Sequence, residues 1–223
     1  MPDLRLVIFD VDGTLVDSQN MIVAAMEVAF EAATLPLPDR TALLSIVGMS
    51  LPEAMLRLVP GASDVVVGTL VDGYRSAYFR LRQTLGSAES SPLFDGMAEV
   101  LRGLAAEPWT LLAVATGKSR RGLDKLIEGH GWQGLFVSGQ TADDHPSKPN
   151  PAMIEQILRD TGVAADRAVM IGDTSFDMDM ARAAGVRSIA VTWGYHSRAA
   201  LDADLYATTP AELTAAIDTL LEP

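Results

Sequence analysis

The alternation of short apolar segments with helical segments most constrains how this 223-residue chain can fold. Apolar runs with β-propensity predict strands at Leu4–Phe9, Thr110–Ala115, Leu135–Val137, Ala168–Ile171 and Ser188–Val191, with a weaker run at Asp204–Tyr206. Helical periodicity falls between them, at Gly96–Ala106, Ser119–Gly129, Pro151–Thr161, Phe176–Ala184 and Pro210–Leu221. Strands that are apolar along their whole length are buried on both faces. The pattern therefore predicts an α/β fold with a Rossmann-like parallel sheet covered by helices.

One interval breaks this alternation. From about Val16 to Ser90 no segment is typical of a strand, and helical patterns cover Ser18–Ala33, Arg40–Val47, Pro52–Leu58 and Ser63–Gly86. We therefore expect a core of residues 1–15 and 91–223, with an all-helical cap domain, residues 16–90, inserted after the first strand. The segment Gly86–Gly96 is expected to be a flexible linker that returns to the core. Ligands bind at the carboxyl ends of parallel strands, so the insert should lie above that edge.

The composition limits the partners of the chain. A net charge of −12 argues against nucleic acid or an anionic membrane as a partner, since both bind basic surfaces. The absence of cysteine excludes disulfides, thiolate metal sites and a cysteine nucleophile. No apolar run approaches the roughly 20 residues of a membrane-spanning helix, and no signal segment is visible, so we expect a cytoplasmic protein. The sequence does not indicate the oligomeric state.

Polar residues follow four of the predicted strands at the point where each strand ends. Because the carboxyl ends of parallel strands lie at one edge of a sheet, these residues can converge although they are far apart in the sequence. They are Asp10 and Asp12 after the first strand, Thr116, Gly117 and Ser119 after the second, Lys148 after the third, and Asp173 and Asp177 after the fourth.

Each group has an ordinary structural explanation when it is taken alone. Thr116 or Ser119 could cap a helix, Asp173 and Asp177 could stabilise a helix start, and Lys148 could be a solvated loop residue. Clustered carboxylates, however, repel one another unless a positive group lies among them. Oxygen ligands without cysteine or a nearby histidine favour a hard cation, Mg²⁺ before Ca²⁺. Together with a hydroxyl, free backbone N–H groups and a lysine, the cluster predicts a phosphate-binding site.

Four motifs resemble those of one enzyme family. They are "DVDGT" (Asp10–Thr14), "ATG" (Ala115–Gly117), "SKPNP" (Ser147–Pro151) and "GDTSFD" (Gly172–Asp177). In this order, and over the whole chain, they resemble the haloacid dehalogenase superfamily, in the branch with a helical C1-type cap after the first strand. A narrower likeness, to phosphoglycolate-phosphatase-like proteins, is carried by features such as "VGMSLPEAM" in the insert.

The resemblance implies roles for the residues that match the motifs. Asp10 would be the nucleophile that forms an aspartyl-phosphate, and Asp12 the general acid and base. Mg²⁺ would be held by the carboxylates of Asp10 and Asp173 and by the backbone carbonyl of Asp12. Lys148 would supply positive charge, and Asp177 would act indirectly, by ordering Lys148 or metal-bound water.

The same resemblance implies supporting roles around these carboxylates. The Thr116 hydroxyl and the Gly117 N–H would bind the transferring phosphoryl oxygens. Gly13 would permit the tight turn after the catalytic pair, and Thr14 would support it.

Substrate selection is expected to lie in the insert. Gly48 and Met49, in the uncharged segment Ile46–Leu51, are the candidates for the surface that faces the leaving group. His196 is at the appropriate edge of the sheet, where it could contact the substrate, the cap or neither.

The expected function is a Mg²⁺-dependent phosphatase that acts on a small phosphorylated metabolite, with phosphoglycolate as one candidate. A β-phosphoglucomutase-like phosphosugar mutase shares the same chemistry and is the first alternative. A dehalogenase is disfavoured because Asp12 supplies an acid that such an enzyme does not need. A catalytically silent binding member of the family is a further alternative.

Overall fold

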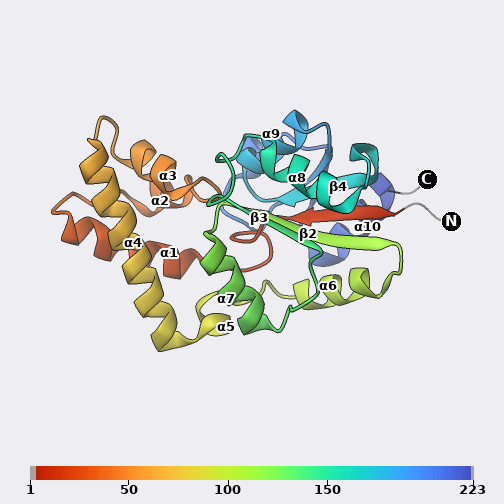
Figure 1. Cartoon of the computed structure of the whole chain (residues 1–223), viewed down its shortest axis with the longest axis horizontal. Coiled ribbons are helices and arrows are strands. Elements are labelled where there is room, and N and C mark those ends of the chain that lie inside the picture. The colour runs from red at the N-terminus through yellow and green to blue at the C-terminus, as the bar shows by residue number, and fades with distance from the viewer. Residues whose placement is uncertain (1–3, 222–223) are drawn as a thin grey trace.

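Six strands form one parallel sheet in the computed structural model, which describes residues 4–221 (Figure 1). The strand order is β3-β2-β1-β4-β5-β6, and every neighbouring pair is parallel. The chain thus winds outward in both directions from β1, which places the topological switch point between β1 and β4. The strands are β1 (Arg5–Phe9), β2 (Thr110–Thr116), β3 (Ser138–Thr141), β4 (Ala168–Gly172), β5 (Arg187–Val191) and β6 (Leu205–Ala207).

Helices cover both faces of this sheet. Along β1, Val7 and Phe9 pack on one side with α6, α7 and α10, whereas Leu6 and Ile8 pack on the other with α8 and α9. This alternation follows from the twofold period of a strand, and it explains why all four residues are apolar. The helices are α6 (Met97–Ala106), α7 (Arg120–His130), α8 (Ala152–Thr161), α9 (Ser175–Ala183) and α10 (Pro210–Leu221), with short 3₁₀ turns η1 (Ala165–Arg167) and η2 (Arg198–Ala200). The predicted α/β fold class is confirmed.

The third strand lies outside its predicted position. The sequence predicted Leu135–Val137, but β3 is the polar segment Ser138–Thr141 at the edge of the sheet. Leu135 and Phe136 instead pack their side chains against the core just before the strand begins. A strand at the edge of a sheet does not require an apolar sequence. The apolar pattern therefore corresponds to the segment before β3 and not to β3 itself.

The insert forms a helical unit with its own hydrophobic cluster. Its elements are α1 (Gln19–Ala32), α2 (Arg40–Leu44), α3 (Leu51–Leu58) and α4 (Asp64–Leu85), and no strand occurs between residues 16 and 90. The predicted helix Arg40–Val47 stops at Leu44, because the following residues turn toward the core. Apolar side chains from all four helices meet in a cluster that includes Met26, Met55 and Leu70.

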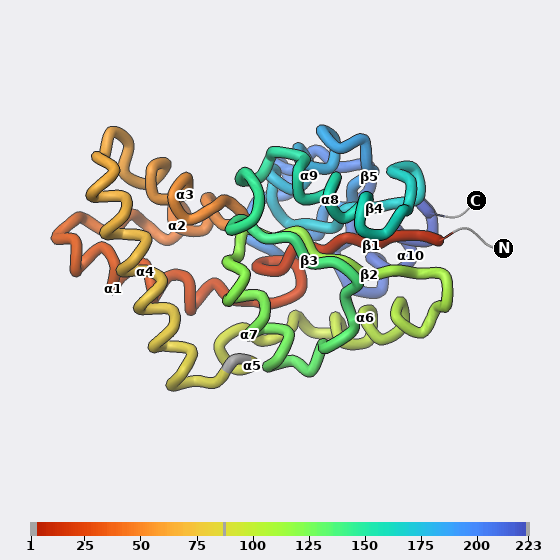
Figure 2. The backbone as a smooth tube through the Cα atoms, in the orientation of Figure 1, coloured from red at the N-terminus to blue at the C-terminus, as the bar shows by residue number. Residues whose placement is uncertain are grey.

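The return to the core contains a short helix, α5 (Ser87–Ser90), where a linker was expected. Gly86, with a φ of +87°, separates it from α4. The C-terminal end of α4 approaches α5, and α5 in turn lies against α7 (Figures 1 and 2). This packing is a tertiary contact that the serine-rich composition of the segment does not reveal. Among residues 4–221, no helix is both long enough and apolar enough to cross a membrane.

Replacing Leu70 by alanine should destabilise the insert. The Leu70 side chain is completely buried, so Leu70→Ala should lower the free energy of unfolding by about 2–5 kcal/mol. Val65, on the same helix, is 77% exposed, and Val65→Ala should change that free energy by less than about 0.5 kcal/mol. Urea denaturation followed by circular dichroism measures both. Equal effects of the two substitutions would contradict the packing described for α4.

Candidate active site

Three buried carboxylates meet at the carboxyl ends of β1 and β4. Asp10 directly follows β1, Asp173 directly follows β4, and Asp177 lies in the first turn of α9. One oxygen from each lies within 4.8 Å of the others, and all three side chains are almost completely buried. Because β1 and β4 are neighbouring parallel strands, residues that are 163 positions apart in the sequence arrive at the same place.

The Asp173 carboxylate is held by two hydrogen bonds. The Thr14 hydroxyl donates to one oxygen at 3.0 Å, and the Tyr195 backbone N–H donates to the other at 2.7 Å. Gly13 has a φ of +87°, and a Cβ atom there would come within 2.2 Å of the Asp173 carboxylate. Only glycine therefore fits this turn, both for its backbone conformation and for the space available.

Lys148 lies inside the carboxylate cluster. Its side chain is completely buried, and its Nζ donates to Asp10 Oδ1 at 2.8 Å and to Asp177 Oδ1 at 2.6 Å. The other oxygen of Asp177 accepts from the backbone and hydroxyl of Thr174, which is the N-cap of α9. Burial alone would lower the pKa of Lys148, but the two carboxylates raise it above its ordinary value, so the lysine is charged.

With all four groups ionised, the cluster would hold three negative charges and one positive charge. Burial raises the pKa of Asp10 to about 7, with a contribution from the Asp177 charge and opposition from Lys148. Burial, followed by the charges of Asp177 and Asp10, raises the pKa of Asp173 as well. Asp10 Oδ2 is buried and has no hydrogen-bond partner within residues 4–221. A divalent cation would offset the repulsion and satisfy this oxygen, and the all-oxygen donor set suits a hard cation.

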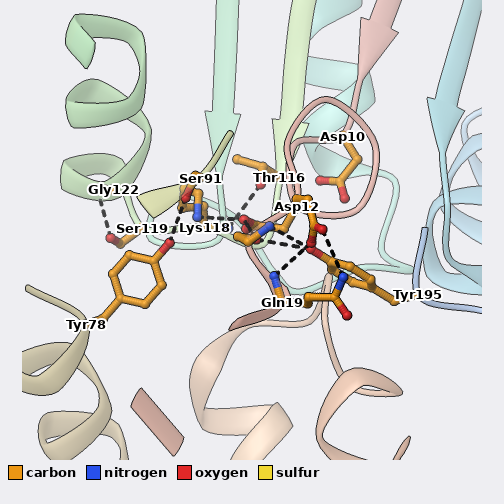
Figure 3. Close-up of polar contacts among 12 residues, drawn as sticks. Asp10, Asp12, Gln19, Tyr78, Ser91, Thr116, Lys118, Ser119, Gly122 and Tyr195 are labelled. Carbon is orange, nitrogen blue, oxygen red and sulfur yellow. Dashed lines mark hydrogen bonds and ion pairs between the residues drawn. The ribbon is translucent and has the colours of Figure 1, made fainter. Parts of the chain in front are cut away.

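Asp12 belongs to a second set of contacts beside the cluster (Figure 3). Its Oδ1 accepts from the Ser18 hydroxyl at 2.5 Å and from Lys118 Nζ at 2.9 Å. Lys118 also lies 5.3 Å from the centre of the Tyr78 ring. The Tyr195 hydroxyl accepts from the backbone N–H of Ser18 at 2.9 Å. Asp12 is thus held by residues from the start of the insert and from the loop after β2.

Sequence reasoning missed Lys118, Ser18 and Tyr195. For Lys118 a signal was present, because it is one of only three lysines and directly follows Gly117 in "TGKS". Ser18 and Tyr195 lie outside the four motifs, and no local pattern connects them with Asp12.

The predicted phosphate-binding residues lie against the insert. Thr116 is buried, and its hydroxyl accepts from the backbone N–H of Lys118 at 3.2 Å. A Cβ atom at Gly117 would come within 2.5 Å of the carbonyl oxygen of Gly48. Gly48 itself has a φ of +99°, so the two loops approach this closely only because each has a glycine.

Two further contacts join the insert to the core. The Ser50 N–H donates to the Ser147 hydroxyl at 2.8 Å. His196 accepts from the Ser175 N–H at Nδ1, at 3.2 Å, so its Nε2 carries the proton and donates to the Ser45 carbonyl at 3.1 Å. Burial lowers the pKa of His196, which favours this neutral form. His196 therefore contacts the insert, an outcome that the sequence left open.

A cavity of about 590 Å³ separates the insert from the core. Asp12, Gly117 and Lys118 line it from the core, and the candidate specificity residues Gly48 and Met49 line it from the insert. Its volume is typical of sites for small molecules.

The family model for haloacid dehalogenase-like hydrolases matches residues 7–191. The chain belongs to this family. The resemblance carried by the four motifs is therefore confirmed. A haloacid dehalogenase-like hydrolase structure from Streptococcus pneumoniae covers 97% of this chain and 99% of its own, with a TM-score of 0.81 and 28% identity.

Curated relatives carry several names. "Probable phosphatase IndB" of Dickeya dadantii is 37% identical over 195 residues, which is 86% of this chain and 83% of that protein. "Phosphoglycolate phosphatase" of Chromobacterium violaceum is 32% identical over 94% of this chain and 95% of that protein. "Tyrosine-protein kinase PtkA" of Mycobacterium tuberculosis is 32% identical over 98% of this chain and 72% of that protein.

Cation binding by this haloacid dehalogenase-like hydrolase should depend on pH. Because burial raises the pKa of Asp10 to about 7, a proton competes with the cation at that carboxylate near neutral pH. Affinity for Mg²⁺ should therefore rise between pH 6 and pH 8 and level off above the pKa. Isothermal titration calorimetry at the two pH values measures this change. The same affinity at both values would contradict a cation site that includes the Asp10 carboxylate.

Proposed function

We propose that this chain is a Mg²⁺-dependent phosphatase that hydrolyses a small phosphorylated metabolite through an aspartyl-phosphate on Asp10. The observation that carries the proposal is the convergence of Lys148 with three buried carboxylates at the ends of β1 and β4. Such a site offers a nucleophile, a hard-cation site and a fixed positive charge in one water-poor place. Family membership and the phosphatase names of two relatives support the same class of reaction.

In the first half-reaction, a carboxylate oxygen of Asp10 attacks phosphorus and the bond between phosphorus and the leaving oxygen breaks. Lys148 already binds Asp10 Oδ1, which leaves Oδ2 without a hydrogen bond among the described residues. Asp12 gives a proton to the leaving oxygen. Both hydrogen bonds that the described residues make to the Asp12 carboxylate go to Oδ1, so its other oxygen is available for this transfer.

In the second half-reaction, water attacks phosphorus of the aspartyl-phosphate and passes a proton to Asp12. The bond between phosphorus and the Asp10 oxygen breaks, which releases inorganic phosphate, restores the Asp10 carboxylate and leaves Asp12 protonated for the next cycle. Lys148, the Thr116 hydroxyl and the Gly117 N–H bind the phosphoryl oxygens during both steps. Mg²⁺, held by Asp10, Asp173 and the Asp12 backbone, would neutralise charge between nucleophile and phosphate.

Asp177 acts through Lys148 in this proposal. Its carboxylate lies in the same cluster as those of Asp10 and Asp173. Both of its oxygens, however, already accept hydrogen bonds, one from Lys148 and the other from Thr174. This arrangement supports the role of fixing the Lys148 ammonium against Asp10.

Residues 16–90 serve as the cap that covers this site, on the core of residues 1–15 and 91–223. The contacts of Ser50 with Ser147 and of His196 with Ser45 support a closed position of the cap. Closure limits the substrate to molecules that fit the cavity and restricts bulk water. Gly48 and Met49 form part of the surface that selects the leaving group, and phosphoglycolate is one candidate substrate.

Activity should require Mg²⁺ and the Asp10 carboxylate. Hydrolysis of p-nitrophenyl phosphate, followed by release of inorganic phosphate, should stop in EDTA and return with Mg²⁺ but not with Ca²⁺, whose coordination is looser. Asp10→Asn should abolish turnover because an amide cannot form the acyl-phosphate. Full activity in EDTA, or labelled phosphate trapped on the Asp10→Asn protein, would refute the mechanism. Transfer of the phosphoryl group to a sugar or to tyrosine in place of water would indicate a mutase or a kinase.

Lys148 should be required for catalysis. Lys148→Ala should reduce kcat by about 30- to 150-fold, which corresponds to the loss of about 2–3 kcal/mol of transition-state stabilisation. Lys125 is an exposed lysine on α7, and Lys125→Ala provides the matched control with kcat near that of the wild type. Steady-state kinetics on p-nitrophenyl phosphate, with circular dichroism to verify folding, measures both. A folded Lys148→Ala protein with wild-type kcat would exclude the assigned role.

A further inference from the structure

The cavity between cap and core is rich in positive charge although the chain as a whole carries a net charge of −12. Two of its four cations are paired with the two acids of the cavity wall. Lys118 binds Asp12 at 2.9 Å, and Arg75 lies 3.7 Å from Asp143.

The other two cations of the wall, Arg82 and Arg121, have no carboxylate partner among the described residues. Arg82 comes from the last turn of α4 in the cap, and Arg121 from the first turn of α7 in the core. The Arg121 guanidinium lies 4.3 Å from the centre of the Phe79 ring, which fixes it against the cap helix. Burial lowers the pKa of Arg82; of the nearby charged groups, Tyr78 raises this pKa and Arg121 lowers it.

Arg82, which is half-buried, and Arg121, which is exposed, line the same cavity, and an anion bound between two like charges offsets their repulsion. The leaving group of the substrate must occupy the same cavity, because Asp12, which protonates the leaving oxygen, lines its wall. The rest of the wall is largely apolar and aromatic, with Met26, Tyr74 and Phe79 among its residues. The cavity is far larger than a two-carbon acid such as glycolate requires.

We infer that Arg82 and Arg121 form a binding site for a second anionic group, a carboxylate or a phosphate, on the leaving group of the substrate. The inference rests on the proposed phosphatase function and narrows the substrate class. The substrate is a phosphoester whose leaving group has an apolar or aromatic body and ends in an anion. The arginines bind this anion and leave the transferring phosphoryl group to Lys148 and the carboxylate cluster.

Matched aryl phosphates test the inference. The wild-type protein should hydrolyse 4-carboxyphenyl phosphate or 1,4-phenylene bisphosphate with a kcat/KM at least about tenfold above that for phenyl phosphate, as expected for a charge-assisted contact. Whichever of the two is preferred identifies the anion. In the Arg82→Gln/Arg121→Gln double variant this preference should fall at least about tenfold, and Arg82→Lys/Arg121→Lys should restore part of it.

Arg80→Gln is the matched control. Arg80 is exposed on the same helix as Arg82 and does not line the cavity, so the preference should persist in this variant. Equal kcat/KM values for the charged and neutral esters in the wild type would overturn the inference. So would an undiminished preference in the folded double glutamine variant. Either result would leave the phosphatase proposal standing.

A binding measurement separates this inference from the proposed reaction. Phosphonates are not hydrolysed, so calorimetry with 4-carboxyphenylphosphonate and phenylphosphonate reports on the arginines without turnover. Tighter binding of the carboxylated probe, lost in the double glutamine variant, supports the anion site even if no ester is hydrolysed. Absence of hydrolysis of every ester with Mg²⁺ would instead refute the phosphatase proposal. Equal binding of both probes to the wild type would overturn the anion site.

Discussion

The ion pairs of Lys148 are the interaction on which the rest of the site depends. Three carboxylates buried within a few ångströms of one another repel strongly, and Lys148 is the cation that binds two of them, Asp10 and Asp177. Breaking such a buried pair leaves charges without compensation, which costs about 3–5 kcal/mol in other proteins. The backbone around the cluster leaves space for its side chains. Glycines at positions 13 and 194 lie against Asp173, where a Cβ atom would overlap the carboxylate side chain.

The insert meets the carboxyl end of the sheet through close backbone and polar contacts. Gly48 meets Gly117 backbone to backbone, and His196 joins Ser45 of the cap to the start of α9. Tyr195 links the two halves of the site, because its N–H holds Asp173 while its hydroxyl contacts Ser18, the residue that binds Asp12. Polar contacts of this kind can be broken and remade at little cost, which is consistent with the proposed role of the insert as a cap.

Much of the fold was predictable because its signals are local. The apolar run of β1 and the helical period of α10 each depend on neighbouring residues alone, and the structure has both where the sequence predicts them. The predictions were wrong where tertiary packing, and not the local sequence, determines the structure. The strand β3 is polar, and the sequence predicted it three residues too early. A strand at the edge of a sheet does not need apolar side chains, so the apolar pattern did not identify it. The short helix α5 depends on its contact with α7.

The sequence by itself determined that acidic, hydroxyl and lysine side chains follow the strands, and the parallel topology then brings their ends together. For that reason the meeting of Asp10, Asp173, Asp177 and Lys148 could be anticipated without coordinates. Only the tertiary structure decided which charges are paired in the cavity and which are not. Lys118 reaches Asp12 because the loop after β2 turns toward the insert, and Arg82 and Arg121 line one cavity because the insert contacts α7. These contacts depend on the relative position of two packed units, and no local sequence pattern encodes that position.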